Sequence, residues 1–158
     1  MLVGSGSIRR TEMGPLVEYQ DLAQTFPYKD VIYRMVLTGA QLKKAIRFIL
    51  REENFDGRHT EFYQFSKGLY VECGEHGGVI GDILFEGRPI DDERTFRVGM
   101  QEFHFKGKEK FIGITDEEAN AIVPVKIIAT CDIDVVDEYL SQTELVKVPD
   151  QPRWARRS

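Results

Sequence analysis

A glycine- and serine-rich segment near the start of the chain is its clearest candidate for chemistry. Residues 4–9 are Gly-Ser-Gly-Ser-Ile-Arg. Glycine lets backbone N–H groups approach a ligand closely, and the guanidinium of Arg9 can pair with a carboxylate or a phosphate. Such segments usually follow a strand, yet only Leu2 and Val3 precede this one after the first methionine. We therefore expect a ligand-binding loop containing Ser7 and Arg9, in a chain that is part of a larger protein.

Aromatic side chains next to a polar segment are the second candidate. Phe103 and Phe105 flank His104 and lead into residues 106–110, Lys-Gly-Lys-Glu-Lys. A ring at the end of a strand, beside a mobile polar loop, can stack on a planar ligand. The alternative is that these rings form the edge of the hydrophobic core, where aromatics are common. The residue types alone leave both interpretations open.

The composition excludes several classes of protein. A length of 158 residues predicts one domain, and 42% hydrophobic with 30% charged residues is typical of globular proteins. The net charge of −5 argues against a nucleic-acid partner, despite short basic clusters at 106–110 and 153–157. No apolar run approaches the roughly 20 residues of a membrane span, so no membrane partner is expected. The N-terminus lacks the features of a signal peptide, and the cellular location is left open.

Other common catalytic arrangements are not found in the sequence. The histidines His59, His76 and His104 lie in no metal-binding spacing, so we expect surface or hydrogen-bonded side chains. The serines lack the Gly-x-Ser-x-Gly spacing of a nucleophile elbow, and no glycine loop continues into a P-loop. Cys73 and Cys131 are expected to be free thiols. We therefore predict no catalytic residue and no metal ligand in this chain.

Apolar periodicity predicts a mixture of helices and strands. The strongest helical pattern covers residues 39–53, and Thr38 with Gln41 forms a capping-box pattern before it. A second amphipathic helix is expected over residues 133–141, with Asp132 as its N-cap. A short helix is expected over 21–25 and strands over 31–37, 68–73, 79–86 and 95–103, whereas 121–130 is not assigned. This order predicts an α+β domain with helices flanking a mixed β-sheet.

The end of the chain differs in composition from the rest. Residues 149–158 are polar and interrupted by two prolines. We predict a compact domain over residues 1–148, followed by a polar tail or linker over 149–158.

Five segments, in order along the chain, resemble the C-terminal domain of the 5'-nucleotidase family, which includes bacterial UDP-sugar hydrolases. The similar segments are Gly-Ser-Ile-Arg at 6–9, Tyr-Gln-Asp-Leu with Phe-Pro-Tyr at 19–28, Leu-Thr-Gly-Ala-Gln-Leu at 37–42, Phe-Tyr-Gln-Phe-Ser-Lys-Gly-Leu at 62–69, and residues 98–111. The resemblance covers about residues 2–140 and implies a fold like that of the 5'-nucleotidase C-terminal domain.

The resemblance also implies a two-domain protein. Family members have an N-terminal metallophosphatase domain with two divalent metal ions and the catalytic residues, and a C-terminal domain that binds the nucleoside part of the substrate. This chain is similar to the second domain only. We therefore expect no cofactor in this chain, a divalent dimetal centre in a missing N-terminal domain, and that domain as its partner.

The site residues implied by the resemblance contact a nucleotide or nucleoside ligand. Arg9 matches an arginine that reaches the substrate near its ribose and phosphate. Tyr28 and Phe103 match two aromatics on either side of the base. Glu109 falls where the family has an aspartate that holds the ribose hydroxyls. Ser7 lies in the glycine loop whose backbone amide would line the edge of the base. Gly107 lies in the second glycine-containing loop, which carries Glu109.

Two positions depart from the family pattern. Gly4 stands where many members carry an asparagine that contacts the base. Gly-Lys-Glu-Lys-Phe at 107–111 replaces Gly-Gly-Asp-Gly-Phe, which lengthens the carboxylate side chain and adds positive charge beside it.

The function implied by the resemblance is nucleotide or nucleoside recognition in a 5'-nucleotidase-type phosphoesterase, which acts in nucleotide catabolism. In the intact enzyme a metal-activated water would attack the phosphate ester, and this chain alone would be inactive. The alternative is a non-catalytic binding or scaffold module that packs on a separate catalytic partner, with its aromatics serving only as core.

Overall fold

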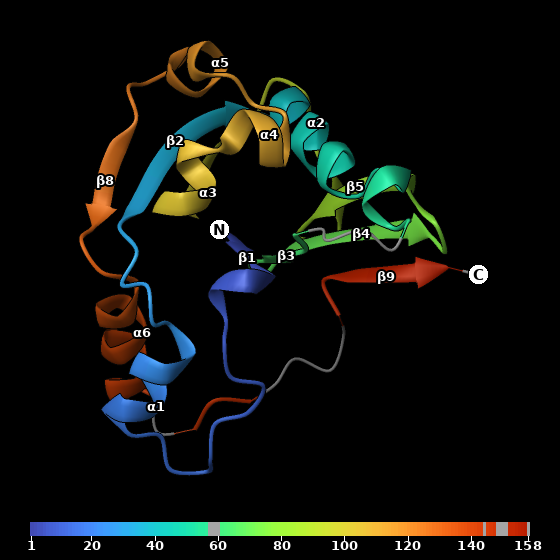
Figure 1. Ribbon diagram of the computed structural model, residues 1–158. Helices are drawn as coiled ribbons and strands as arrows, with labels where there is room; N and C mark the ends of the chain where they lie inside the picture. Colours follow the sequence, from blue (N-terminus) through green and yellow to red (C-terminus); the bar gives the residue numbers. More distant parts are fainter. Residues whose placement is uncertain (57–60, 144, 148–151, 158) are drawn as a thin grey trace.

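The chain folds into two β-sheets with helices packed around them, as described by a computed structural model for residues 1–56, 61–143, 145–147 and 152–157 (Figure 1). This arrangement confirms the α+β class and the flanking helices, although the strands form two sheets where the sequence predicted one. Both sheets contain parallel and antiparallel pairs, so the prediction of mixed pairing is also confirmed.

The larger sheet has five strands among the described residues, in the order β3-β1-β7-β2-β8. Its strands are β1 Leu2–Gly4, β2 Ile32–Thr38, β3 Tyr63–Phe65, β7 Thr95–Gln101 and β8 Lys126–Ala129. The short strand β1 pairs antiparallel with β3 and parallel with β7, so the N-terminal segment lies inside the sheet. Strand β8 occupies part of the region that the sequence left unassigned.

The second sheet has the order β6-β5-β4-β9. Its strands are β4 Leu69–Gly74, β5 Gly77–Phe85, β6 Arg88–Pro89 and β9 Trp154–Arg157. Strand β9 pairs in parallel with β4, and the ring of Trp154 lies parallel to that of Phe62 at 6.2 Å between centroids. The prediction of a polar tail over 149–158 is therefore wrong for Trp154–Arg157. These residues form a strand because they pair with β4 and because Trp154 stacks on Phe62. Residues 148–151 and 158 lie outside the described part of the chain.

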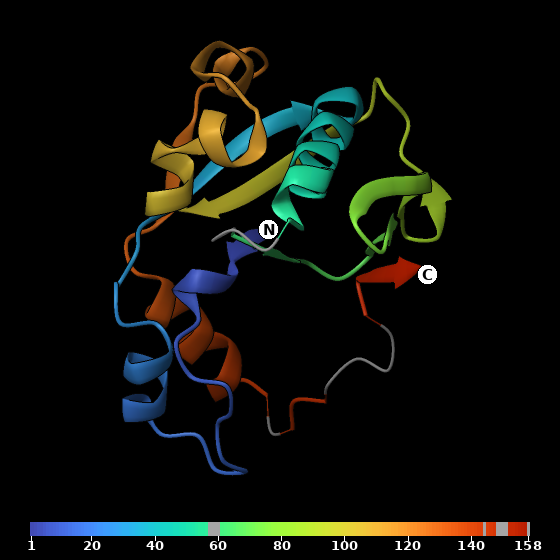
Figure 2. The ribbon, with the colours of Figure 1, turned by 45° about the vertical axis from the view of Figure 1, so that its right-hand side comes forward.

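The helices surround the two sheets. They are α1 Tyr19–Thr25, α2 Gly39–Ile49, α3 Glu102–Lys106, α4 Lys108–Ile112, α5 Asp116–Asn120 and α6 Asp132–Ser141, with single 3₁₀ turns η1 Ser5–Ser7 and η2 Glu52–Asn54. Helices α1 and α6 lie side by side in both views of the ribbon (Figures 1 and 2). Among the residues that the structure describes, no helix is long and apolar enough to cross a membrane.

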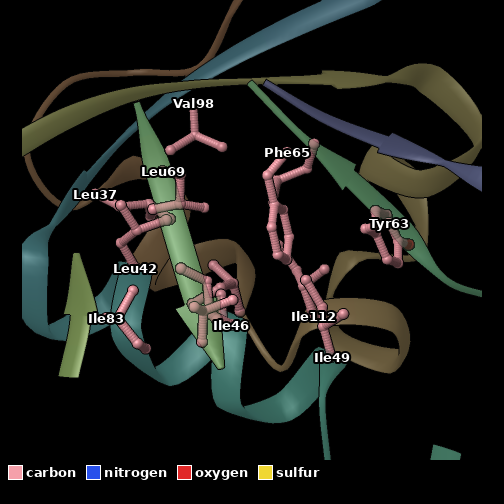
Figure 3. Packing of buried hydrophobic residues seen from close by; sticks show 14 of the residues in the cluster. Leu37, Leu42, Ile46, Ile49, Tyr63, Phe65, Leu69, Ile83, Val98 and Ile112 are labelled. Atoms are coloured by element: carbon pink, nitrogen blue, oxygen red, sulfur yellow. The ribbon is translucent and has the colours of Figure 1, made fainter. Parts of the chain in front are cut away.

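The hydrophobic core lies between α2 and strands of both sheets. Ala45, Ile46 and Ile49 on one face of α2 are fully buried, as the apolar periodicity predicted. Figure 3 shows side chains from α2, β2, β3, β4, β5, β7 and α4 meeting in one cluster. Burying a large aliphatic side chain stabilises a fold by about 1.5–3 kcal/mol, so this cluster supplies the main support for the elements that carry the candidate site.

Helix α2 begins where the sequence predicted and ends earlier. Thr38 and Gln41 each accept a hydrogen bond from the backbone N–H of the other, which confirms the capping box. The helix stops at Ile49 because later groups take its last carbonyls. Asn54 Nδ2 donates to Ile49 O at 2.7 Å, and the N–H of Gly78 donates to the carbonyl of Leu50 at 2.6 Å. Residues 52–54 form the separate turn η2.

The segment after β7 is helical, although the sequence predicted a strand to residue 103 and a mobile polar loop after it. Strand β7 ends at Gln101, and α3 and α4 follow with only Gly107 between them. The loop prediction failed because Lys108 is not solvated. It is 5% exposed, it pairs with Asp116, and its ammonium lies 4.6 Å from the centre of the Phe105 ring.

The boundaries of α1 and α6 differ slightly from those predicted. Helix α1 begins at Tyr19 with a capping box between Glu18 and Asp21, two residues before the expected start. Helix α6 has Cys131 as its N-cap, whereas the sequence predicted Asp132. Asp132 is instead the first helical residue, and its buried carboxylate accepts a hydrogen bond from Gln101 Nε2 at 2.8 Å.

Candidate functional site

A cavity of about 470 Å³ lies where four segments of the chain converge. The segment after β1 contributes Gly6, Ser7 and Arg9, and the connection from α1 to β2 contributes Tyr28 and Asp30. Glu61, just before β3, also lines the cavity, and α3 contributes Phe103 and His104. The structure thus brings together Ser7, Arg9, Tyr28 and Phe103, which the sequence analysis selected. Their roles toward a ligand stay predictions.

Two aromatic rings in this cavity are unusually exposed for their size. Tyr28 is 57% exposed and Phe103 is 63% exposed. The ring of Phe103 is supported from behind, because it contacts His104 edge-on at 5.2 Å and Phe111 at 5.5 Å between centroids. Phe103 is therefore a fixed, open ring on a helix, and the interpretation that it is only part of the core does not describe it.

The glycine loop is held by Glu61. The N–H of Gly6 donates to Glu61 Oε1 at 2.6 Å, and the N–H of Ser5 donates to the carbonyl of Phe62 at 2.7 Å. A Cβ at Gly4 would lie 2.3 Å from the His104 ring, and one at Gly6 would lie 2.9 Å from the Glu61 carboxylate. The buried His104 ring therefore favours glycine at position 4, whereas a side chain at position 6 would displace the end of the Glu61 side chain.

Arg9 follows this loop and is exposed at the cavity. Its backbone N–H donates to the carbonyl of Thr25 at 2.9 Å, and its Nη1 donates to the carbonyl of Gly6 at 3.4 Å. These contacts hold the start of the side chain near α1, while most of its guanidinium donors have no partner among the described residues and could bind an anionic ligand group.

His104 is the histidine that the structure places in the site. It is 2% exposed, and its Nε2 lies 3.5 Å from Glu61 Oε1. Tyr63, Phe103 and Phe111 enclose its ring. Burial lowers the pKa of His104 below its usual value of 6.5, although the nearby carboxylates of Glu61 and Asp30 oppose this. The imidazole is therefore neutral at pH 7, and it lies near both acidic side chains of the cavity.

Asp30 is the second carboxylate of the cavity. Burial raises its pKa, and the neighbouring carboxylates of Asp132 and Glu102 add to this effect, whereas His104 and a hydrogen bond from the backbone of Phe103 oppose it. The sequence did not predict Asp30, Glu61 and His104 as site residues, because none of them forms a motif. Their sequence neighbours were the only signal: Asp30 lies two residues after Tyr28, Glu61 precedes Phe62, and His104 follows Phe103.

Two predicted site residues lie elsewhere. Glu109 is an exposed residue of α4 and Gly107 precedes that helix, and neither is among the residues that line the cavity. A Cβ at Gly107 would lie 2.5 Å from the Phe111 ring, so close packing explains this glycine. The contact predicted between Glu109 and a ribose stays a prediction.

The described residues contain no group of three or more His, Cys, Asp or Glu side chains that could hold a metal ion. Cys73 and Cys131 are free thiols, as expected. The cavity therefore offers aromatic faces, one guanidinium and two carboxylates, a set that suits binding and orientation of a planar polar ligand.

The family model of the 5'-nucleotidase C-terminal domain matches residues 2–116. This range includes the entire lining of the cavity. No curated protein sequence resembles the chain significantly.

Several solved structures have a similar fold. A 5'-nucleotidase precursor from Thermus thermophilus matches 98% of this chain with a TM-score of 0.74 and 22% identity. The NAD nucleotidase of Haemophilus influenzae matches 99% with a TM-score of 0.77 and 15% identity. This chain covers 31% and 30% of those two proteins, respectively. It thus corresponds to less than a third of their length, and at these identities the likeness shows the fold.

Proposed function

Because the chain belongs to the family of the 5'-nucleotidase C-terminal domain, we propose that it is the nucleotide-recognition domain of a 5'-nucleotidase-type phosphoesterase. In this proposal the cavity beside α3 holds the nucleoside. The chemistry of phosphate-ester hydrolysis belongs to a longer protein, since the chain spans about 30% of the length of NAD nucleotidase.

The observation that carries the proposal is the pair of exposed rings in one cavity. Tyr28 and Phe103 come from segments 75 residues apart in sequence and line the same space. Stacking of a base on an aromatic side chain contributes about 1–3 kcal/mol per base and does not depend strongly on which base is present. Two such rings would provide most of the affinity for a nucleoside.

Arg9 and the glycine loop supply the polar contacts in this proposal. The guanidinium of Arg9 binds the ribose and phosphate side of the ligand, because its planar fork suits phosphate oxygens. Ser7 is buried in the loop held by Glu61, and in this proposal its backbone amide lines the edge of the base. These contacts orient the ligand so that its phosphate points out of the cavity.

The described residues contain no group of side chains that could hold the metal ions that the family implies. We propose that an N-terminal metallophosphatase domain holds a divalent dimetal centre and that these ions activate the attacking water. The residues of this chain then bind the nucleoside and position the phosphate.

A shift titration by NMR tests the proposal. AMP, UMP and inorganic phosphate are added separately to the ¹⁵N-labelled chain and to its Phe103→Ala variant. We expect AMP and UMP, unlike phosphate, to shift the signals of Arg9, Tyr28 and Phe103, and the variant to bind about tenfold or more weakly.

The matched control is Tyr139→Ala, which removes a ring of similar exposure, 58%, from α6. This variant should bind like the wild type. Equal weakening by both substitutions, or no shift up to millimolar nucleotide, would contradict nucleoside recognition and favour the scaffold module.

A further inference from the structure

Among the residues that the structure describes, the lining of the proposed nucleoside cavity has more acidic than basic side chains. The charged members of this lining are Arg9 and the carboxylates of Asp30 and Glu61, since burial keeps His104 neutral. This is unexpected in a site for an anionic nucleotide. Within the described part of the chain, no lysine or arginine forms an ion pair with either carboxylate. Both acids therefore face the ligand space without a neutralising cation among these residues.

The positions of both carboxylates are fixed. Asp30 is 9% exposed, its carboxylate accepts a hydrogen bond from the backbone N–H of Phe103, and its backbone carbonyl accepts one from the N–H of Asp132 at 2.9 Å. Glu61 accepts from the N–H of Gly6 through Oε1, and this oxygen also faces His104. These donors approach Oε1, which leaves Oε2 without a donor among the described residues.

Ionised carboxylates only accept hydrogen bonds, so the part of a ligand beside them must donate. Nucleobases differ in this property. Guanine presents two adjacent donors, its N1–H and its 2-amino group, from which two free carboxylate oxygens can accept hydrogen bonds. Adenine and cytosine present one amino group beside an unprotonated ring nitrogen, and uracil presents one N–H between two carbonyls that a carboxylate repels.

We infer that Asp30 and Glu61 make this cavity selective for a base with an exposed amino edge, guanine above all. This inference rests on the proposed nucleoside site. The acidic wall binds the N1–H and the 2-amino group, Tyr28 and Phe103 stack on the faces of the purine, and Arg9 binds the phosphate. Arg9 and the two acids therefore bind opposite ends of the ligand, which explains how an acidic cavity accepts an anionic nucleotide.

Calorimetric titration with GMP and IMP is the sharpest test, because these nucleotides differ only in the 2-amino group. We expect GMP to bind about tenfold more tightly than IMP, within the discrimination usual for one good bidentate contact, and UMP to bind most weakly. The double variant Asp30→Asn/Glu61→Gln keeps the size of both side chains and an oxygen that accepts from Gly6. It should reduce the ratio of GMP to IMP affinity to about twofold or less.

Glu138→Gln, an exposed substitution on α6, is the charge-matched control and should keep the wild-type ratio. An NMR spectrum of each variant establishes that it is folded, and the wild-type ratio does not depend on any variant. Equal binding of GMP and IMP, or a ratio that persists in the double variant, overturns the inference. If Phe103→Ala weakens both nucleotides in that case, nucleoside binding itself stands. If no nucleotide binds in a Phe103-dependent way, the proposed function fails first.

Discussion

The core around α2 and the cavity beside α3 differ in how their polar groups are satisfied. At the start of α2, Thr38 and Gln41 satisfy each other's hydrogen-bonding groups. The side chains on the inner face of this helix are apolar and buried. Near the cavity, several buried polar atoms have no hydrogen-bond partner among the described residues: Tyr63 Oη, Gln101 Oε1, Asp132 Oδ1 and His104 Nδ1. Each such group costs about 1–3 kcal/mol if it stays unpaired.

This contrast separates the closed hydrophobic core from the cavity that we propose as a binding site. Unsatisfied buried groups are rare in folded proteins and concentrate where a ligand, water or strain is involved. Of these residues His104 lines the cavity, and its ring contacts Tyr63 and Phe103 and lies directly beside Gly4 of the glycine loop. We therefore expect substitutions in the α2 core to affect mainly the free energy of unfolding, and substitutions at the cavity to affect mainly binding.

The largest effect is expected from Ile46→Ala in the core. Ile46 is fully buried in α2, and its truncation leaves a cavity among the side chains shown in Figure 3. The free energy of unfolding should fall by about 2–5 kcal/mol in urea titrations. Arg47→Ala, on the exposed side of the same helix, is the control and should change it by less than about 0.5 kcal/mol. Similar losses for both would show that the core face is wrongly assigned.

Gly4→Ala should have the next largest effect. The new methyl group would lie 2.3 Å from the His104 ring, so the loop or α3 must move, at a cost of about 1–3 kcal/mol in unfolding free energy. Nucleotide affinity should also fall, because the loop positions Arg9 and α3 carries Phe103. Gly14→Ala, where the nearest atom is 3.5 Å away, is the control measured by the same unfolding and titration experiments. A neutral Gly4→Ala would contradict the close packing of loop and histidine.

Arg9→Ala should change binding while leaving stability nearly unchanged. The exposed guanidinium makes one long hydrogen bond to the described part of the chain, so its loss removes little from the fold. Affinity for AMP should fall about tenfold, as is usual for a lost charged contact, and affinity for adenosine should fall much less. Equal losses for AMP and adenosine in calorimetry would exclude Arg9 from the phosphate side of the ligand.

The smallest effect is a pH dependence of stability that comes from His104. Its pKa in the folded chain lies below the ordinary value of 6.5 because of burial. As the pH falls through about 6.5, the unfolded chain therefore takes up a proton before the folded chain does, and stability decreases. Urea unfolding at pH 7.5 and pH 5.5 should show a larger loss for the wild type than for His104→Leu. Equal losses would mean that His104 is not held neutral.

The sequence predicted the α2 core well because its signals are local. The capping pair Thr38 and Gln41 and the spacing of Leu42, Ile46 and Ile49 lie within a few turns of one helix. The strands β2, β4, β5 and β7 were also predicted to within a few residues, since their apolar alternation is likewise local.

The cavity could be predicted only in part because its support comes from long-range contacts. Ser7, Arg9, Tyr28 and Phe103 were identified through the resemblance to the family, whereas Glu61 and His104 act through partners more than 40 residues away in sequence. The helical turn at Lys108 was missed for a similar reason. Its polar residues indicated a loop, and only the folded chain places Phe105 and Asp116 against the lysine.

In the proposed complex, the rings of Tyr28 and Phe103 hold one base between them. Intermolecular nuclear Overhauser effects between AMP and this chain can detect that arrangement. We expect contacts from the adenine H2 and H8 protons to both rings, and no contact from either proton to Tyr139. Adenine contacts to Tyr139 or to other exposed side chains, with none to Tyr28 and Phe103, would show that the two rings do not bind the base.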